Sequence, residues 1–184
     1  MMAPIIINKI MPQIDDPNVY TSTKDEICSL VSDFYICEPY LNYKVKMEFI
    51  KTFISKFEKF IDLKSNFIVL EKTIFTFEHL LCSIKKDIED NKKLLIYPKM
   101  AESVKSVIRV CEEKILPLGD KLDKKTIAKF TKDKKADVFS CIKTVLNSVY
   151  EMNAELKPKE SINEIKNISK QEDDKDNKGK CILF

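Results

Sequence analysis

The stretch Asn66–Asn91, NFIVLEKTIFTFEHLLCSIKKDIEDN, repeats apolar residues at intervals of three and four. This spacing puts them on one face of an α-helix, so it predicts a helix over residues 66–91. A stripe this wide has to be covered by other helices, which favours an all-α bundle. The stripe consists of Phe67, Leu70, Ile74, Phe77, Leu81, Ile84 and Ile88, and it is widened by Ile68, Phe75 and Leu80.

Other stretches of the chain repeat the same pattern. Long amphipathic helices are predicted over residues 43–63, from Pro98 to a stop at Pro117, and over residues 134–156. A short helix is predicted from the capping box Thr23-x-x-Glu26 to a stop before Pro39. We therefore expect an all-α fold, an antiparallel bundle of four long amphipathic helices plus one or two short helices.

The chain divides by composition into three parts. Residues 1–20 contain Pro4, Pro12 and Pro17 around short apolar pieces, which predicts an extended N-terminal arm. Residues 21–157 hold the helical patterns and are expected to form one bundle domain. Residues 158–184 are mostly polar, and residues 171–180 contain no apolar side chain, so we expect a disordered, flexible tail.

The composition excludes several classes of protein. The 32 basic residues nearly balance the 29 acidic ones, giving a net charge of +3, so a nucleic-acid partner is not expected. The two glycines, Gly119 and Gly179, are too few for a phosphate-binding loop or a dinucleotide fold. Arg109 is the one arginine, which excludes a paired-arginine clamp on phosphate or carboxylate.

The residues of catalysis and metal binding are sparse. His79 is the one histidine, and no cysteine or serine motif lies beside it in the sequence. The six cysteines form no Cys-x-x-Cys pair and show no zinc spacing, and their use suits a reducing compartment. We expect no enzyme, no metal site and no cofactor. No run reaches the roughly 18 apolar residues of a membrane-spanning helix, and no signal peptide is predicted.

The sequence Cys181-Ile182-Leu183-Phe184 resembles the CaaX box of prenylated eukaryotic proteins. The resemblance implies a geranylgeranyl or farnesyl group on Cys181, with the terminal phenylalanine favouring geranylgeranyl, followed by methylation. The alternative is that the last three residues dock on the body as an apolar hook. The lysines before Cys181 are offset by acidic residues, so we expect a cytoplasmic protein held reversibly at a membrane surface by its lipid.

Two further patterns concern lipids. Six phenylalanines of the helices predicted over 43–63 and 66–91 are interpreted as core, with an apolar cavity as the alternative: Phe49, Phe53, Phe57, Phe60, Phe75 and Phe77. Six lysines form the best candidate contact for an anionic lipid, with a solvated charged loop as the alternative: Lys124, Lys125, Lys129, Lys132, Lys134 and Lys135. The order and length of the helices resemble the TIPE family of phospholipid-carrying helical cylinders, although no diagnostic motif supports it.

Two hypotheses about function follow. The first is a prenylated, non-enzymatic adaptor that binds a protein partner through a groove between helices. The second is a lipid carrier or phospholipid sensor with an apolar cavity inside the bundle.

Overall fold

The structure is a computed structural model that describes residues 3–37, 43–90, 98–132 and 136–157. The tail predicted at 158–184, with Cys181, lies outside the described residues. The described part is all-α, and its only strand pairing is the antiparallel ladder of β1 (Thr131–Lys132) with β2 (Ala136–Asp137). Its helical segments are α1 (Ala3–Ile5), η1 (Ile6–Ile10), η2 (Met11–Asp15), α2 (Thr21–Cys37), α3 (Tyr43–Phe57), η3 (Glu58–Phe60), α4 (Phe67–Asp90), α5 (Pro98–Val110), η5 (Cys111–Ile115), α6 (Leu116–Asp120), α7 (Lys124–Ile127), η6 (Ala128–Phe130), α8 (Val138–Met152) and η7 (Ala154–Leu156).

The N-terminal segment is helical, so the prediction of an extended arm is wrong for residues 3–15. The segment runs without a break through α1, η1 and η2. Five of its apolar residues are buried against the body: Ala3, Ile6, Ile7, Met11 and Ile14. Ile6, Met11 and Ile14 are each 0% exposed. Pro4 and Pro12 do not prevent this, because they lie at the starts of α1 and η2, where an intrahelical N–H donor is not needed.

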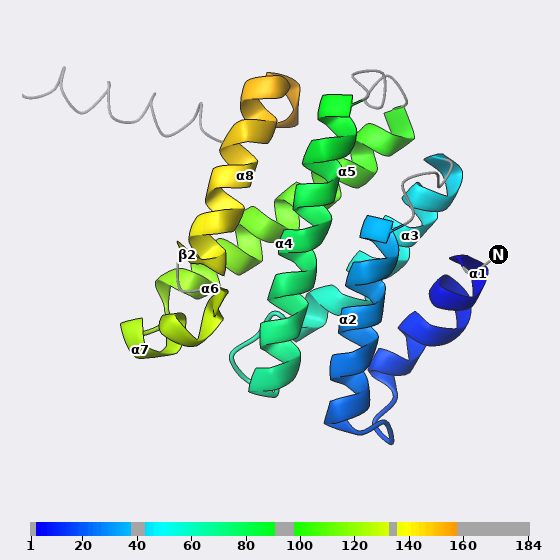
Figure 1. Cartoon of the computed structure of the whole chain (residues 1–184), viewed down its shortest axis with the longest axis vertical. Helices are drawn as coiled ribbons and strands as arrows, with labels where there is room; N and C mark the ends of the chain where they lie inside the picture. Colours follow the sequence, from blue (N-terminus) through cyan, green and yellow to red (C-terminus); the bar gives the residue numbers. More distant parts are fainter. Residues whose placement is uncertain (1–2, 38–42, 91–97, 133–135, 158–184) are drawn as a thin grey trace, which may run out of the picture.

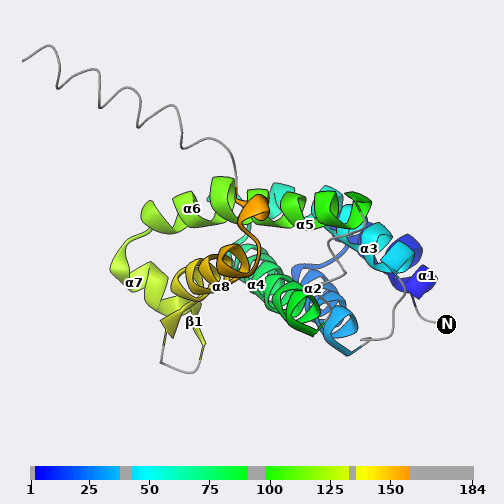
Figure 2. The same ribbon diagram turned by 90° about the horizontal axis from the view of Figure 1, so that it is seen from above.

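The helical bundle has two layers. α2, α4 and α8 lie side by side in one layer, and the N-terminal segment, α3 and the α5–η5–α6 segment form the other (Figures 1 and 2). Successive long segments of the chain alternate between the layers (Figure 2). α2 has 17 residues, so it is a full member of its layer where a short helix was expected.

Salt bridges show how neighbours within a layer are oriented. Lys72 of α4 pairs with Asp25 of α2 at 3.5 Å, near the start of both helices. Lys56, near the end of α3, pairs with Asp15 at the end of η2 at 2.8 Å. Both pairs join corresponding ends, so neighbouring helices within a layer run parallel. The described part is all-α, as expected, and its helices stack in two layers.

A buried salt bridge joins the two layers. Lys46, at the start of α3, lies 2.5 Å from Asp87, near the end of α4. The Lys46 side chain is only 6% exposed, and that of Asp87 is 25% exposed. Because the pair joins opposite ends of consecutive helices, α3 and α4 are antiparallel.

The α5 helix continues past the point at which Pro117 was expected to end it. The π-helical turn η5 follows α5 directly, and α6 carries Pro117 in its first turn. In the first turn of a helix, the missing N–H of proline is tolerated because that donor would have no intrahelical partner. The π turn that precedes it is a common local variation within an α-helix.

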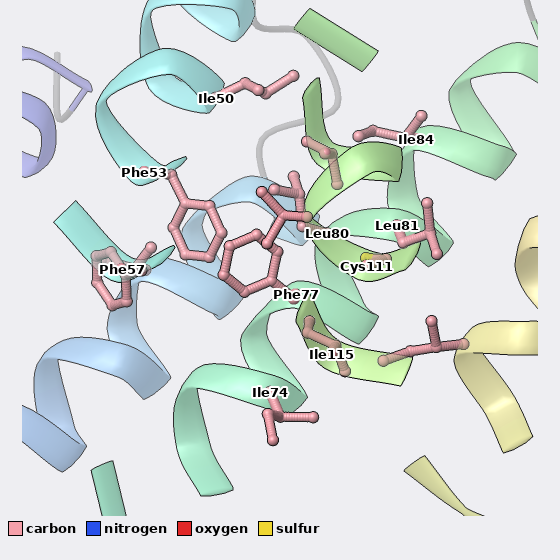
Figure 3. Close-up of a cluster of buried hydrophobic side chains, with 14 of the residues drawn as sticks. Ile50, Phe53, Phe57, Ile74, Phe77, Leu80, Leu81, Ile84, Cys111 and Ile115 are labelled. Carbon is pink, nitrogen blue, oxygen red and sulfur yellow. The ribbon is translucent and has the colours of Figure 1, made fainter. Parts of the chain in front are cut away.

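The core lies between the layers. Phe53 and Phe57 of α3 meet Phe77 of α4, with Cys111 and Ile115 of η5 beside them (Figure 3). At one end, α6 approaches α8 so closely that Gly119 lies against the ring of Phe139. A β-carbon built on Gly119 would lie 2.7 Å from Cδ1 of that ring. Glycine is thus needed there for close packing of α6 on α8.

Candidate functional site

The predicted phenylalanine cluster forms part of the core. Phe49, Phe53 and Phe57 follow each other at four-residue spacing along α3 and are 0–1% exposed, and Phe77 of α4 is also buried. The ring centroids of Phe53 and Phe77 are 4.6 Å apart, as are those of Phe53 and Phe57 (Figure 3). Contact at these distances is ordinary aromatic packing.

The other two residues of that cluster, Phe60 and Phe75, are partly buried and pack against the same core. They thicken the core at its edge, where η3 and α4 meet the other segments. The six rings therefore contribute to packing between the layers.

The predicted lysine cluster lies around α7. Lys124 and Lys125 are exposed in α7, and Lys129 in η6 holds its Nζ 5.3 Å from the ring centroid of Phe67. That contact is a cation–π interaction with the start of α4. Lys132 lies in β1. Lys134 and Lys135, like Cys181, lie outside the described residues.

A surface groove runs between α3 and α5, with a volume of about 740 Å³. Its floor on the α3 side is apolar, formed by Met47, Ile50 and Ile54 at spacings of three and four residues. Its wall on the α5 side is built from Ser103 and Ser106, whose small side chains leave the space open. The groove is rimmed by Lys44, Glu48, Lys51, Ser55, Lys99, Glu102 and Arg109.

The two serine hydroxyls of the groove already have hydrogen-bond acceptors. Ser103 Oγ donates to the carbonyl oxygen of Lys99 at 2.9 Å, and Ser106 Oγ donates to that of Glu102 at 2.9 Å. This internal bonding is common for serine within helices. The serine side chains of this wall are therefore small, and their hydroxyl donors need no acceptor from a ligand.

The charged rim has a basic excess. Four basic side chains (Lys44, Lys51, Lys99 and Arg109) face two acidic ones (Glu48 and Glu102), and all six are exposed. Within the described part of the chain, no salt bridge involves any of the six.

Three lysines near the groove, in α3, η3 and η5, are paired with acidic residues. Lys56 and Lys59 both contact Asp15, and Lys114 lies 2.9 Å from Glu58. The four basic side chains of the rim, like the exposed Lys64 and Lys105 outside the groove, have no salt bridge to a described residue.

Three described cysteines have thiols that stay protonated at neutral pH: Cys28, Cys82 and Cys111. Burial raises the pKa of Cys28 to about 12, and it raises the pKa of Cys111 still further. Burial also raises the pKa of Cys82 to about 12, with help from Glu78, whose carboxylate accepts a hydrogen bond from the thiol at 3.3 Å. Thiols held in the protonated form are poor nucleophiles and poor metal ligands.

The described residues also place His79 and show what they offer a metal ion or a membrane. His79 lies beside Glu78, with 3.5 Å between Nε2 and Oε2. Over the described ranges, no group of three or more His, Cys, Asp or Glu residues is placed to hold a metal ion. Over the same ranges, no helix is both long and apolar enough to cross a membrane.

The groove was not identified from the sequence, although its signal is present there. Met47, Ile50 and Ile54 alternate along α3 with the core residues Phe49, Phe53 and Phe57, so the apolar pattern does not show which of them line a groove. The serines at positions 103 and 106 are small residues at helical spacing, and this pattern alone does not show which helix they face.

Comparison of the chain with protein-family models, with curated proteins and with solved structures found no match.

Proposed function

We propose that the chain is a non-enzymatic helical adaptor, held reversibly at a cytoplasmic membrane face by a prenyl group on Cys181. The observation that carries the membrane part is the sequence Cys-Ile-Leu-Phe at 181–184 behind a polar spacer. The observation that supports the binding part is the open groove between α3 and α5. A protein partner would bind there, and the lipid would bring the complex to the membrane.

Each residue of the motif has a role in the proposed modification. The Cys181 sulfur forms a thioether with the first carbon of an isoprenoid diphosphate, and diphosphate leaves. Ile182 and Leu183 suit the apolar groove of a prenyltransferase, which also requires a free carboxylate on Phe184. After removal of the last three residues, the new terminal carboxylate is methylated, which takes away its charge.

The expected membrane residence is reversible. Each buried methylene contributes about 0.8 kcal/mol, and a single lipid chain normally needs a second signal for stable anchoring. Lys175, Lys178 and Lys180 are offset by four acidic residues between 172 and 176, so the second signal is weak. A partner bound to the body would supply a second attachment.

An adaptor is favoured over a lipid carrier by the packing of the phenylalanines. The rings of Phe53, Phe57 and Phe77 fill the space between α3 and α4 with contacts at 4.6 Å. None of the six phenylalanines considered for a cavity lines the α3–α5 groove. The groove is open and has a charged rim, which suits the polar and apolar faces of a protein segment.

The test is the intact mass and detergent-phase partitioning of the chain ending at Phe184, produced in eukaryotic cells. We expect a mass gain for one geranylgeranyl group, loss of three residues and one methyl ester, all absent from Cys181→Ser. Phe184→Ser should change the attached group to farnesyl, since the last residue selects the lipid. Cys141→Ser is the matched control and should keep the modification. An unmodified mass with aqueous partitioning of all four proteins would overturn the membrane part of the proposal.

A further inference from the structure

The α3–α5 groove has the dimensions of a seat for a short helix. Lys44 and Ser55 mark its two ends along α3, and eleven helical steps of about 1.5 Å span roughly 16 Å. That length matches about three turns of a bound helix. The apolar residues on the floor lie at positions 47, 50 and 54, the spacing at which one helix presents apolar residues to another.

The composition of the two walls supports a helix as the occupant. Met47 is half-buried, and methionine is flexible and adapts to the shape of an apolar partner. On the opposite wall, Ser103 and Ser106 allow a helix backbone to approach closely, and their hydroxyls are occupied by their own helix. A helix with one apolar face also keeps its backbone hydrogen bonds to itself, so the groove needs to offer none.

The charge of the rim selects the kind of helix. Four basic side chains stand on the rim against the two acidic ones, Glu48 and Glu102: Lys44, Lys51, Lys99 and Arg109. None of the four has a salt bridge to a described residue. Arg109 is the one arginine of the chain, and its guanidinium is suited to bidentate contact with a carboxylate. Such a rim attracts acidic partners and repels basic ones.

We propose that the α3–α5 groove binds a short amphipathic helix of a partner protein, with three apolar residues at helical spacing and carboxylates flanking them. This inference rests on the proposed function as an adaptor and names the class of partner. The inference concerns binding alone. The helix can fail to bind the groove while prenylation of Cys181 is found, or it can bind while Cys181 stays unmodified. The two experiments therefore separate the two proposals.

The test uses the full chain and two synthetic 15-residue helical probes, each about four helical turns long. Both carry leucines at positions i, i+3 and i+7. One has glutamates on the flanks of the leucine stripe, and its twin has lysines at the same positions. Binding is measured by fluorescence anisotropy at low and high salt.

We expect the acidic probe to bind at least about tenfold more tightly than its basic twin, with the difference shrinking at high salt. The double variant Lys51→Glu with Arg109→Glu changes two exposed rim residues and should remove or reverse the preference. The double variant Lys64→Glu with Lys105→Glu is the matched control, because both residues are exposed outside the groove and the change in net charge is the same. It should bind within about twofold of the original chain.

Three outcomes would overturn the proposal. The first is equal binding of the two probes, or no binding of either at about 1 mM. The second is an equal loss of binding in the rim variant and the control variant, which would place the site elsewhere. The third is binding of the acidic probe only after residues 158–184 are removed, which would make the chain's own tail the occupant of the groove.

Discussion

The substitution Gly119→Ala tests the close packing of α6 on α8. The added β-carbon would lie 2.7 Å from Cδ1 and 2.8 Å from Cγ of Phe139, whereas ordinary contacts begin at 3.4 Å. The ring would have to move by about 0.7 Å, and overpacking of this kind typically costs about 1–3 kcal/mol. Phe139 is only 8% exposed and packs on Phe130, with 5.4 Å between ring centroids, so the ring has little room.

A second effect of the same substitution has the opposite sign. Gly119 lies in α6, and alanine is favoured over glycine within a helix by about 1 kcal/mol. The two effects together predict a net loss of about 1 kcal/mol in the free energy of unfolding. For a chain of this size, that is a fall of about 2–4 °C in the melting temperature.

The assay is urea unfolding followed by circular dichroism, on a cycle of four proteins. In the Phe139→Ala background the ring is gone, so Gly119→Ala should be stabilising by about 1 kcal/mol through helix propensity alone. The expected coupling between the two sites is therefore about 2 kcal/mol. If Gly119→Ala is as stable as the original chain, or has the same effect in both backgrounds, contact with Phe139 is not the reason for the glycine.

Two other predictions concern ionisable groups. Asp15 is desolvated by burial, which raises its pKa, but hydrogen bonds from Lys56 and Lys59 outweigh this and leave the pKa below the ordinary 3.8. The contribution of Asp15 to stability is therefore present above pH 3.8 and lost as the pH falls through its lowered pKa. Asp15→Asn should be less stable than the original chain at neutral pH and equally stable in strong acid. Urea unfolding across this pH range checks the prediction, and a stability difference that does not change with pH would contradict it. Cys28 and Cys82, whose pKa is raised from 9.0 to about 12, should carry about 1,000-fold less thiolate at pH 8 than in the unfolded chain and react correspondingly slowly with iodoacetamide. Peptide mass mapping of native and urea-unfolded protein measures this, and equal labelling in both states would refute it.

The sequence predicted the elements well where the apolar period is long and uninterrupted. The helix expected over 66–91 is α4 at Phe67–Asp90, and the one expected over 43–63 is α3 with η3. The helix expected from residue 134 begins later, at Val138, because Asp137 caps it by accepting a hydrogen bond from the Ser140 backbone at 2.9 Å. Local periodicity and capping are properties of neighbouring residues, so they can be recognised in one sequence.

The N-terminal segment and the groove could not be predicted in this way. Pro4 and Pro12 suggested an extended arm, and only the burial of Ile6 and Met11 against the body shows why the segment is helical. The α3–α5 groove depends on which helices lie side by side, and this is a property of the whole stack. Side-chain pairing of Arg109 or Lys51 depends on the same placement, so a basic rim could not be distinguished from ordinary surface charge.

The stacking of the helices in layers has a mechanical consequence. α2 and α8 lie on opposite sides of α4, so disturbance at one end of the layer reaches the other end through that helix (Figure 1). Stability is not uniform across such a structure, and an end helix can open while the rest stays folded. A pull on the C-terminal end of the chain would load α8 first. Tyr150 of α8 donates a hydrogen bond to Glu112 of η5, so this load passes on to the segment whose α5 part forms one wall of the α3–α5 groove.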